Sequence, residues 1–84
     1  MKTVRELKAA LEKMNRLYEE SDRLFLIDED ASDKLYSDAY AVQTEIADTL
    51  VKVTSGIIDR KTAHTMIFRK EYQARLLAIC EKFA

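Results

Sequence analysis

The chain has 84 residues, of which 48% are hydrophobic and 35% are charged, with one glycine and no proline. This balance is typical of one small globular domain and excludes disorder, and the shortage of turn-forming residues excludes a fold of many short strands and favours helices. The formal net charge of −1 gives no overall attraction to nucleic acid or to an anionic membrane.

Cysteine use and hydropathy indicate where the protein works. The single cysteine, Cys80, cannot form a disulfide within the chain, and the first residues contain no apolar signal region. No apolar run approaches the roughly 20 residues that span a bilayer. We therefore expect a cytoplasmic protein with no membrane partner.

The first segment has the period of an amphipathic helix over residues 4–27. Thr3 and Glu6 match a capping box, in which each side chain satisfies a free backbone N–H of the first turn. Apolar positions then recur at spacings of three and four, which predicts a single buried stripe. The stripe consists of Val4, Leu7, Leu11, Met14, Tyr18, Ser21 and Phe25.

The second segment predicts a helix over residues 31–54 with two apolar flanks. The acidic run 28–33 interrupts the apolar pattern, so we expect a tight reversal there, with Asp30 or Ser32 as the N-cap. The main flank is Leu35, Ala39, Val42, Ile46, Leu50 and Val53, and the second is Tyr36, Tyr40, Ala47 and Val51. Two flanks predict two neighbours, as the central helix of a bundle requires.

The third segment predicts one long helix over residues 60–83. Gly56 is expected at the left-handed C′ position that ends the second helix, and Asp59 at the next N-cap. The buried stripe should contain Phe68, Tyr72, Leu76, Ile79 and Phe83. The predicted fold is all-α, a single domain over residues 1–84 in which three long amphipathic helices form an antiparallel bundle.

The acidic run matches part of the pattern of a calcium-binding loop. Asp28, Asp30 and Ser32 alternate as the first three ligands of an EF-hand do, but Asp33 stands where the loop needs glycine and Ala39 where it needs glutamate. Helix capping explains the run better. We predict no metal site.

The sequence does not assemble the groups of an active site. His64 and Cys80 are separated by about 24 Å along one predicted helix, at 1.5 Å per residue. Catalysis by Cys80 would need a base within hydrogen-bond reach. We expect a solvated His64 and a buried Cys80, and predict that the protein is not an enzyme and holds no cofactor.

Charge is uneven along the chain, with balances of +1 over residues 1–27, −5 over 28–56 and +3 over 57–84. Four residues of the predicted third helix fall near one line and form a candidate basic stripe: Arg60, His64, Arg75 and Lys82. Such a stripe could bind phosphate groups. The alternative function is therefore a nucleic-acid-binding accessory protein that uses this helix.

Apolar side chains beyond the core stripes favour a different function. We expect an interface formed by Tyr36, Tyr40, Val51, Ala63, Ile67 and Ala74. Tyrosines are enriched in protein interfaces, and small residues allow helices to approach closely. The sequence therefore predicts a small non-catalytic adaptor or regulatory protein that binds a protein partner, itself or both, and that forms a homodimer.

Overall fold

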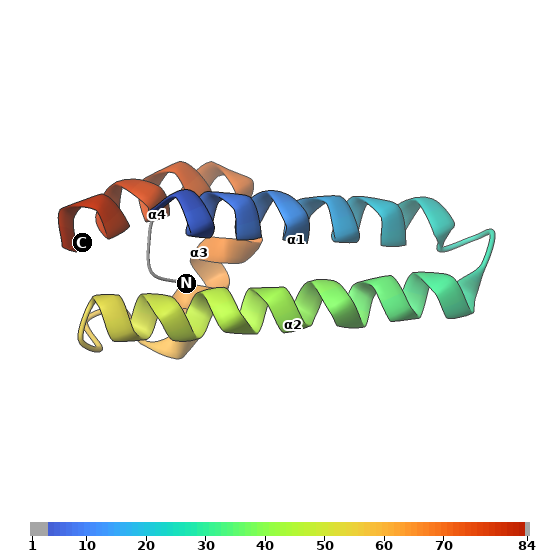
Figure 1. Ribbon diagram of the computed structural model, residues 1–84. Helices are drawn as coiled ribbons and strands as arrows, with labels where there is room; N and C mark the ends of the chain where they lie inside the picture. The colour runs from blue at the N-terminus through green and yellow to red at the C-terminus, as the bar shows by residue number, and fades with distance from the viewer. Residues whose placement is uncertain (1–3, 84) are drawn as a thin grey trace.

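The computed structural model describes residues 4–83, with the backbone alone for Phe83. The described chain forms four helices and no strand: α1 (Val4–Leu24), α2 (Glu29–Val53), α3 (Arg60–Phe68) and α4 (Lys70–Phe83) (Figure 1). The predicted all-α class is confirmed, but the prediction of three helices is wrong because the third segment is divided at Arg69. The expected cap at Thr3 and the side chain of Phe83 lie outside what the structure describes.

The helices α1 and α2 form a long antiparallel hairpin that gives the molecule extents of 42 × 21 × 21 Å (Figure 1). The first helix ends at Leu24, three residues earlier than predicted. Asp28 is the N-cap of α2, since its side chain accepts a hydrogen bond of 3.2 Å from the Ala31 N–H. The expected caps at Asp30 and Ser32 are wrong, because the cap at Asp28 precedes them by two and four residues.

The end of α2 is a Schellman motif. The Gly56 N–H donates to the Val51 carbonyl at 2.9 Å, and the Ser55 N–H donates to the Lys52 carbonyl at 3.2 Å. Gly56 has the expected positive φ, 84°, but the C′ position belongs to Ser55, whose φ is 53°. Gly56 was expected at C′ but occupies the next position, C″.

The helix α3 begins as predicted and ends much earlier. Asp59 is its N-cap and accepts a hydrogen bond of 2.7 Å from the Thr62 N–H, which lowers the pKa of Asp59. Arg69 then has extended backbone angles of −97° and 117°, so α4 starts in a new direction. The break reverses the expected burial: Ile67 is 0% exposed and Phe68 is 68% exposed.

The hydrophobic core lies in one half of the molecule. In Figure 1, α3 and α4 lie against the half of the hairpin that contains the start of α1 and the end of α2, and no further helix covers the half that ends in the α1–α2 turn. The core residues come from all four helices and one loop: Leu7, Leu11, Met14, Ile46, Ala47, Leu50, Ile58, Ala63, Ile67, Leu76 and Cys80. We refer to residues 15–41, the half nearer the turn, as the outer half of the hairpin.

Candidate protein-binding surface

Large apolar side chains are exposed mainly on or beside the outer half. This group consists of Phe25, Leu26, Ile27, Tyr36, Tyr40 and Phe68. Ile57, in the α2–α3 connection, is also exposed but lies at the opposite end of the hairpin. The exposed apolar surface therefore gathers where the hairpin has no covering helix.

A groove opens between the outer half and the start of α4. Its apolar lining comes from Met14 and Tyr18 of α1, Tyr36 of α2 and Phe68 of α3, and its volume is about 270 Å³. The polar rim contains Asn15, Glu19, Asp22 and Lys70. We call this hollow the aromatic groove. A shallower hollow beside it contains His64 and shares Phe68 as a wall.

Ring contacts fix the aromatic side chains around the groove. The Tyr18 and Tyr36 rings meet edge to face, with centroids 5.3 Å apart and an interplanar angle of 71°. The Tyr40 ring stacks on His64 at 5.9 Å and 12°. Both arrangements are favourable geometries for ring pairs. The surface that a partner would meet is therefore largely ordered in advance.

A partly buried hydrogen-bonded chain beside the groove joins α1, α2 and α3. The Tyr18 hydroxyl donates to Gln43 Oε1 at 2.6 Å, and Gln43 Nε2 lies 3.0 Å from His64 Nδ1. With the Gln43 amide nitrogen as the donor, His64 Nδ1 is the acceptor of this contact. Burial, with the neighbouring phenols of Tyr36 and Tyr40, raises the pKa of Tyr18. His64 is thus half-buried and bonded, where the sequence analysis expected it to be solvated.

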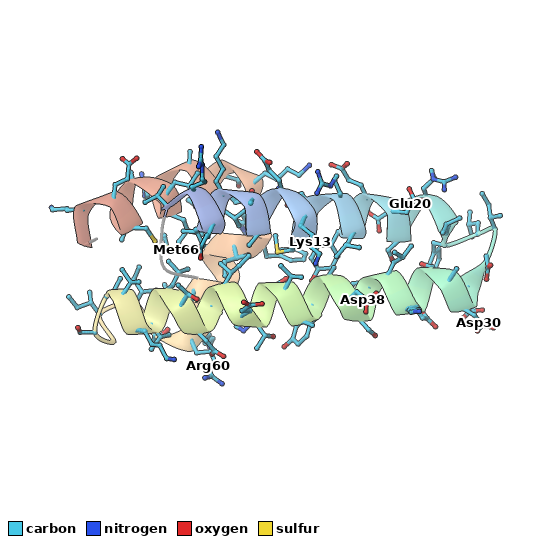
Figure 2. The ribbon with its side chains drawn as sticks, in the orientation of Figure 1. Lys13, Glu20, Asp30, Asp38, Arg60 and Met66 are labelled. Atoms are coloured by element: carbon cyan, nitrogen blue, oxygen red, sulfur yellow. The ribbon has the colours of Figure 1, made fainter. Side chains whose placement is uncertain are left out.

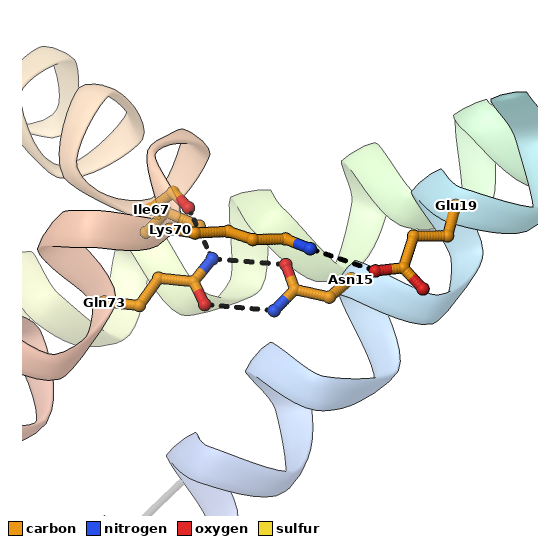
Figure 3. Close-up of polar contacts among 5 residues, drawn as sticks. All are labelled: Asn15, Glu19, Ile67, Lys70 and Gln73. Atoms are coloured by element: carbon orange, nitrogen blue, oxygen red, sulfur yellow. Dashed lines mark hydrogen bonds and ion pairs between the residues drawn. The ribbon is translucent and has the colours of Figure 1, made fainter.

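A second set of polar contacts holds α4 against α1 and fixes the break at Arg69. The amides of Asn15 and Gln73 form two hydrogen bonds of 3.0 and 3.2 Å (Figure 3). Gln73 Nε2 also donates to the Ile67 carbonyl at 2.9 Å, and Lys70 Nζ pairs with Glu19 at 2.9 Å. These contacts satisfy a carbonyl that the break leaves free. They hold the helix end that presents Phe68.

The outer half itself is closed by two serines. The Ser21 hydroxyl donates to the Ser32 carbonyl at 2.9 Å, and the Ser32 hydroxyl donates to the Ser21 carbonyl at 2.7 Å. Both serines are buried. Small side chains let the two helices approach closely at this point of the hairpin. Phe25 was expected to continue the buried stripe, but it is exposed because α1 ends before it.

Of the six predicted interface residues, four keep some exposed surface and two are fully buried. Tyr36 and Tyr40 are half-exposed beside the groove, and Ala74 is exposed on α4. Val51 is partly buried near the end of α2.

Ala63 and Ile67 must be corrected. Both are 0% exposed in the core, so the surface patch expected around Ile67 is not present in the folded chain. The expectation assumed one straight helix that buries Phe68, whereas α3 is a separate element that turns its other face to the hairpin. The sequence around Arg69 contains no glycine or proline, so no helix-breaking residue predicted the break.

The candidate basic stripe is divided between two helices, with Arg60 and His64 on α3 and Arg75 and Lys82 on α4. The break at Arg69 ends the common line on which the stripe was predicted. Arg60 Nη2 is also paired with Asp48 Oδ1 at 2.8 Å, which compensates part of its charge within the fold. The stripe is therefore not a continuous surface of one helix.

Other kinds of site have little support in the geometry. Among residues 4–83, no group of three or more histidine, cysteine and acidic side chains converges as metal ligands would. No helix of the described chain combines the length and apolar character needed to cross a membrane. Cys80 is buried as expected, and its burial raises the pKa of the thiol.

Comparison with protein-family models gave no match, and neither the curated proteins nor the solved structures gave a significant match. The geometry of the chain itself is the basis for a functional proposal.

Proposed function

We propose that the protein acts by binding proteins, a second copy of itself among them, through the aromatic groove, and that its role is that of a small non-catalytic adaptor or regulator. The observation that carries this proposal is that Tyr36 and Phe68, each more than half exposed, line a groove that no helix of the described chain covers. The half-exposed Tyr40 stacks on His64, which lines the hollow beside it. A cytoplasmic setting is part of the proposal and rests on the single buried thiol of Cys80.

Aromatic side chains are well suited to this role. Tyrosine and phenylalanine give large contact areas for few rotatable bonds, and aromatic residues are enriched at the centres of protein interfaces. The contacts of Tyr36 with Tyr18, and of Tyr40 with His64, already restrict these rings. Binding then costs less ordering entropy than it would with free side chains.

The position of the surface supports protein binding as well. Exposed apolar residues scattered singly need no explanation, but a contiguous patch in a soluble domain often marks an interface. Around the outer half, Phe25, Leu26 and Ile27 are largely exposed, and Tyr36 and Tyr40 stay about half exposed although each has a ring contact. A protein partner would remove them from water.

The groups around the groove favour binding over catalysis. Glu19 and Lys70 are paired with each other, and Nδ1 of His64 is occupied by Gln43. Cys80 is in the core on α4, and its thiol has a raised pKa, which disfavours the reactive thiolate. These groups are therefore held in structural contacts.

The test is capture from a lysate of the native host on immobilised wild-type protein, Phe68→Glu and Ile57→Glu. Ile57 is a matched control because its side chain is 77% exposed but lies far from the groove. Untagged copies of the chain are added to the lysate. We expect wild type and Ile57→Glu to retain the same proteins, including the untagged chain, and Phe68→Glu to lose them. Identical retention by all three would contradict the proposal, and retention of nucleic acid alone would favour the alternative function.

A further inference from the structure

The α1–α2 turn carries three consecutive apolar side chains that project into water. Phe25, Leu26 and Ile27 are 63%, 92% and 74% exposed. Backbone hydrogen bonds order this turn, since the Phe25 N–H donates to Asp22 at 3.3 Å and the Ile27 N–H to Leu24 at 3.0 Å. We call residues 25–27 the apolar tip. It is an ordered apolar projection at the end of the outer half.

The charges at the two ends of the aromatic groove are opposite. The charged residues that flank the tip in the chain are mostly acidic, with Asp22, Asp28, Glu29, Asp30 and Asp33 against Arg23 and Lys34. At the other end, next to Phe68, the α3–α4 junction presents the exposed Arg69 and Lys70. Figure 2 shows Asp30 at the α1–α2 turn. One molecule therefore carries an acidic apolar tip and a groove with mixed charges on its rim, whose end away from the tip lies next to Lys70 and Arg69.

We infer that the apolar tip of one molecule binds in the aromatic groove of a second copy, in an antiparallel dimer with two-fold symmetry. This inference rests on the proposed function and names its partner. In the antiparallel arrangement, the acidic residues around each tip meet Arg69 and Lys70 of the other copy. A parallel pair would place the two acidic tips together, which like charges oppose.

The dimensions agree with a reciprocal contact. Phe25 follows Tyr18 by seven residues, about 10 Å along the helix at 1.5 Å per residue. A two-fold axis midway between the tip and the groove can therefore place the tip of each copy in the groove of the other. A cavity of about 150 Å³ can hold a benzene ring. The groove, at about 270 Å³, has room for the Phe25 ring and one further apolar side chain.

The two-fold symmetry closes the assembly. The contact between the two copies is small. Each copy contributes one tip and one groove, so two equal contacts satisfy both molecules and no further copy can add. Half of the 42 × 21 Å outline is roughly 440 Å² as a flat area, against about 800 Å² per partner in a standard interface. We therefore expect a dimer that dissociates in the micromolar range.

Site-directed cross-linking tests the arrangement. On a Cys80→Ala background, one chain carries Leu26→Cys in the tip and a second, larger tagged chain carries Thr65→Cys on exposed α3 next to the groove wall. Each chain then has one thiol, so every product of a short bis-maleimide linker is intermolecular. We expect the mixed product to exceed both single-variant products several-fold, and to fall with rising salt. Ile57→Cys in place of Thr65→Cys is the control and should give only background.

The outcomes separate this inference from the proposed function. A dominant product between two Leu26→Cys chains would overturn the antiparallel arrangement. Background alone in every mixture would overturn self-pairing through the tip, and the proposed function would still stand if Phe68-dependent capture of other proteins persisted. Loss of that capture as well would contradict both.

Discussion

The neighbouring residues Ile67 and Phe68 should respond in opposite ways to alanine substitution. Ile67 is fully buried on α3 and belongs to the same core cluster as Leu76 of α4. Truncation of a buried isoleucine to alanine removes apolar contacts and leaves a cavity, at a cost of about 2–5 kcal/mol. Phe68 is 68% exposed, so its truncation should change the free energy of unfolding of the monomer by no more than about 0.5 kcal/mol.

The size of the Ile67 effect matters for a chain this short. At roughly 0.05–0.15 kcal/mol per residue, the whole domain has a free energy of unfolding of roughly 4–13 kcal/mol. Ile67→Ala therefore removes a large share of it. Urea titration followed by far-UV circular dichroism, at a concentration low enough to keep the chain monomeric, measures both variants. We expect a much lower midpoint for Ile67→Ala and an unchanged one for Phe68→Ala.

The opposite pattern would refute the reasoning. An uninterrupted helix over residues 60–83 would bury Phe68 and expose Ile67, as the apolar period alone predicts. In that case Phe68→Ala would be the destabilising change and Ile67→Ala would be nearly neutral. Such a result would contradict the break at Arg69 and the groove that depends on it.

Three further predictions concern single positions. Ser55→Gly should raise the melting temperature by about 2–8 °C, because relief of a positive φ outweighs the added entropy of glycine by about 0.5–1 kcal/mol; an unchanged or lower temperature would argue against the Schellman motif. Gln43→Ala should cost about 1–3 kcal/mol in urea titration, because Tyr18 and His64 both lose a partner; a neutral effect would show that the hydrogen-bonded chain is not formed. The pKa of Cys80 is raised by burial, so unfolding exposes a thiol that ionises more readily. Stability should therefore fall as the pH rises above the ordinary pKa of a thiol, and fall less in Cys80→Ala; identical pH profiles would contradict this.

The helical period was enough to predict the hairpin and part of the surface. Leu7, Leu11 and Met14 are buried on α1 as expected, and Ile46 and Leu50 on α2. The second flank of α2 also predicted the exposed tyrosines of the candidate surface. Period alone works here because both helices keep one face towards each other over their length.

Two interruptions of the helical period were not predicted: one is held by a tertiary contact and the other is set by a local helix cap. The break at Arg69 is held by Gln73, which bonds both Asn15 and the Ile67 carbonyl, across 58 residues in the first case. Phe25 fits the buried stripe by its spacing, yet the cap at Asp28 and the end of α1 leave it in the turn. The groove and the tip both depend on these two interruptions, so the sequence predicted the exposed tyrosines but neither of these two features.

Sedimentation equilibrium of the wild-type chain, Phe68→Glu and Ile57→Glu, over a micromolar concentration range, tests most directly whether the aromatic groove is an interface. We predict that wild type and Ile57→Glu approach about twice the 9.7 kDa mass of one chain at the highest concentrations. Phe68→Glu should stay near the mass of one chain, with the same helical content. Equal masses for wild type and Phe68→Glu at every concentration would contradict self-association through the groove.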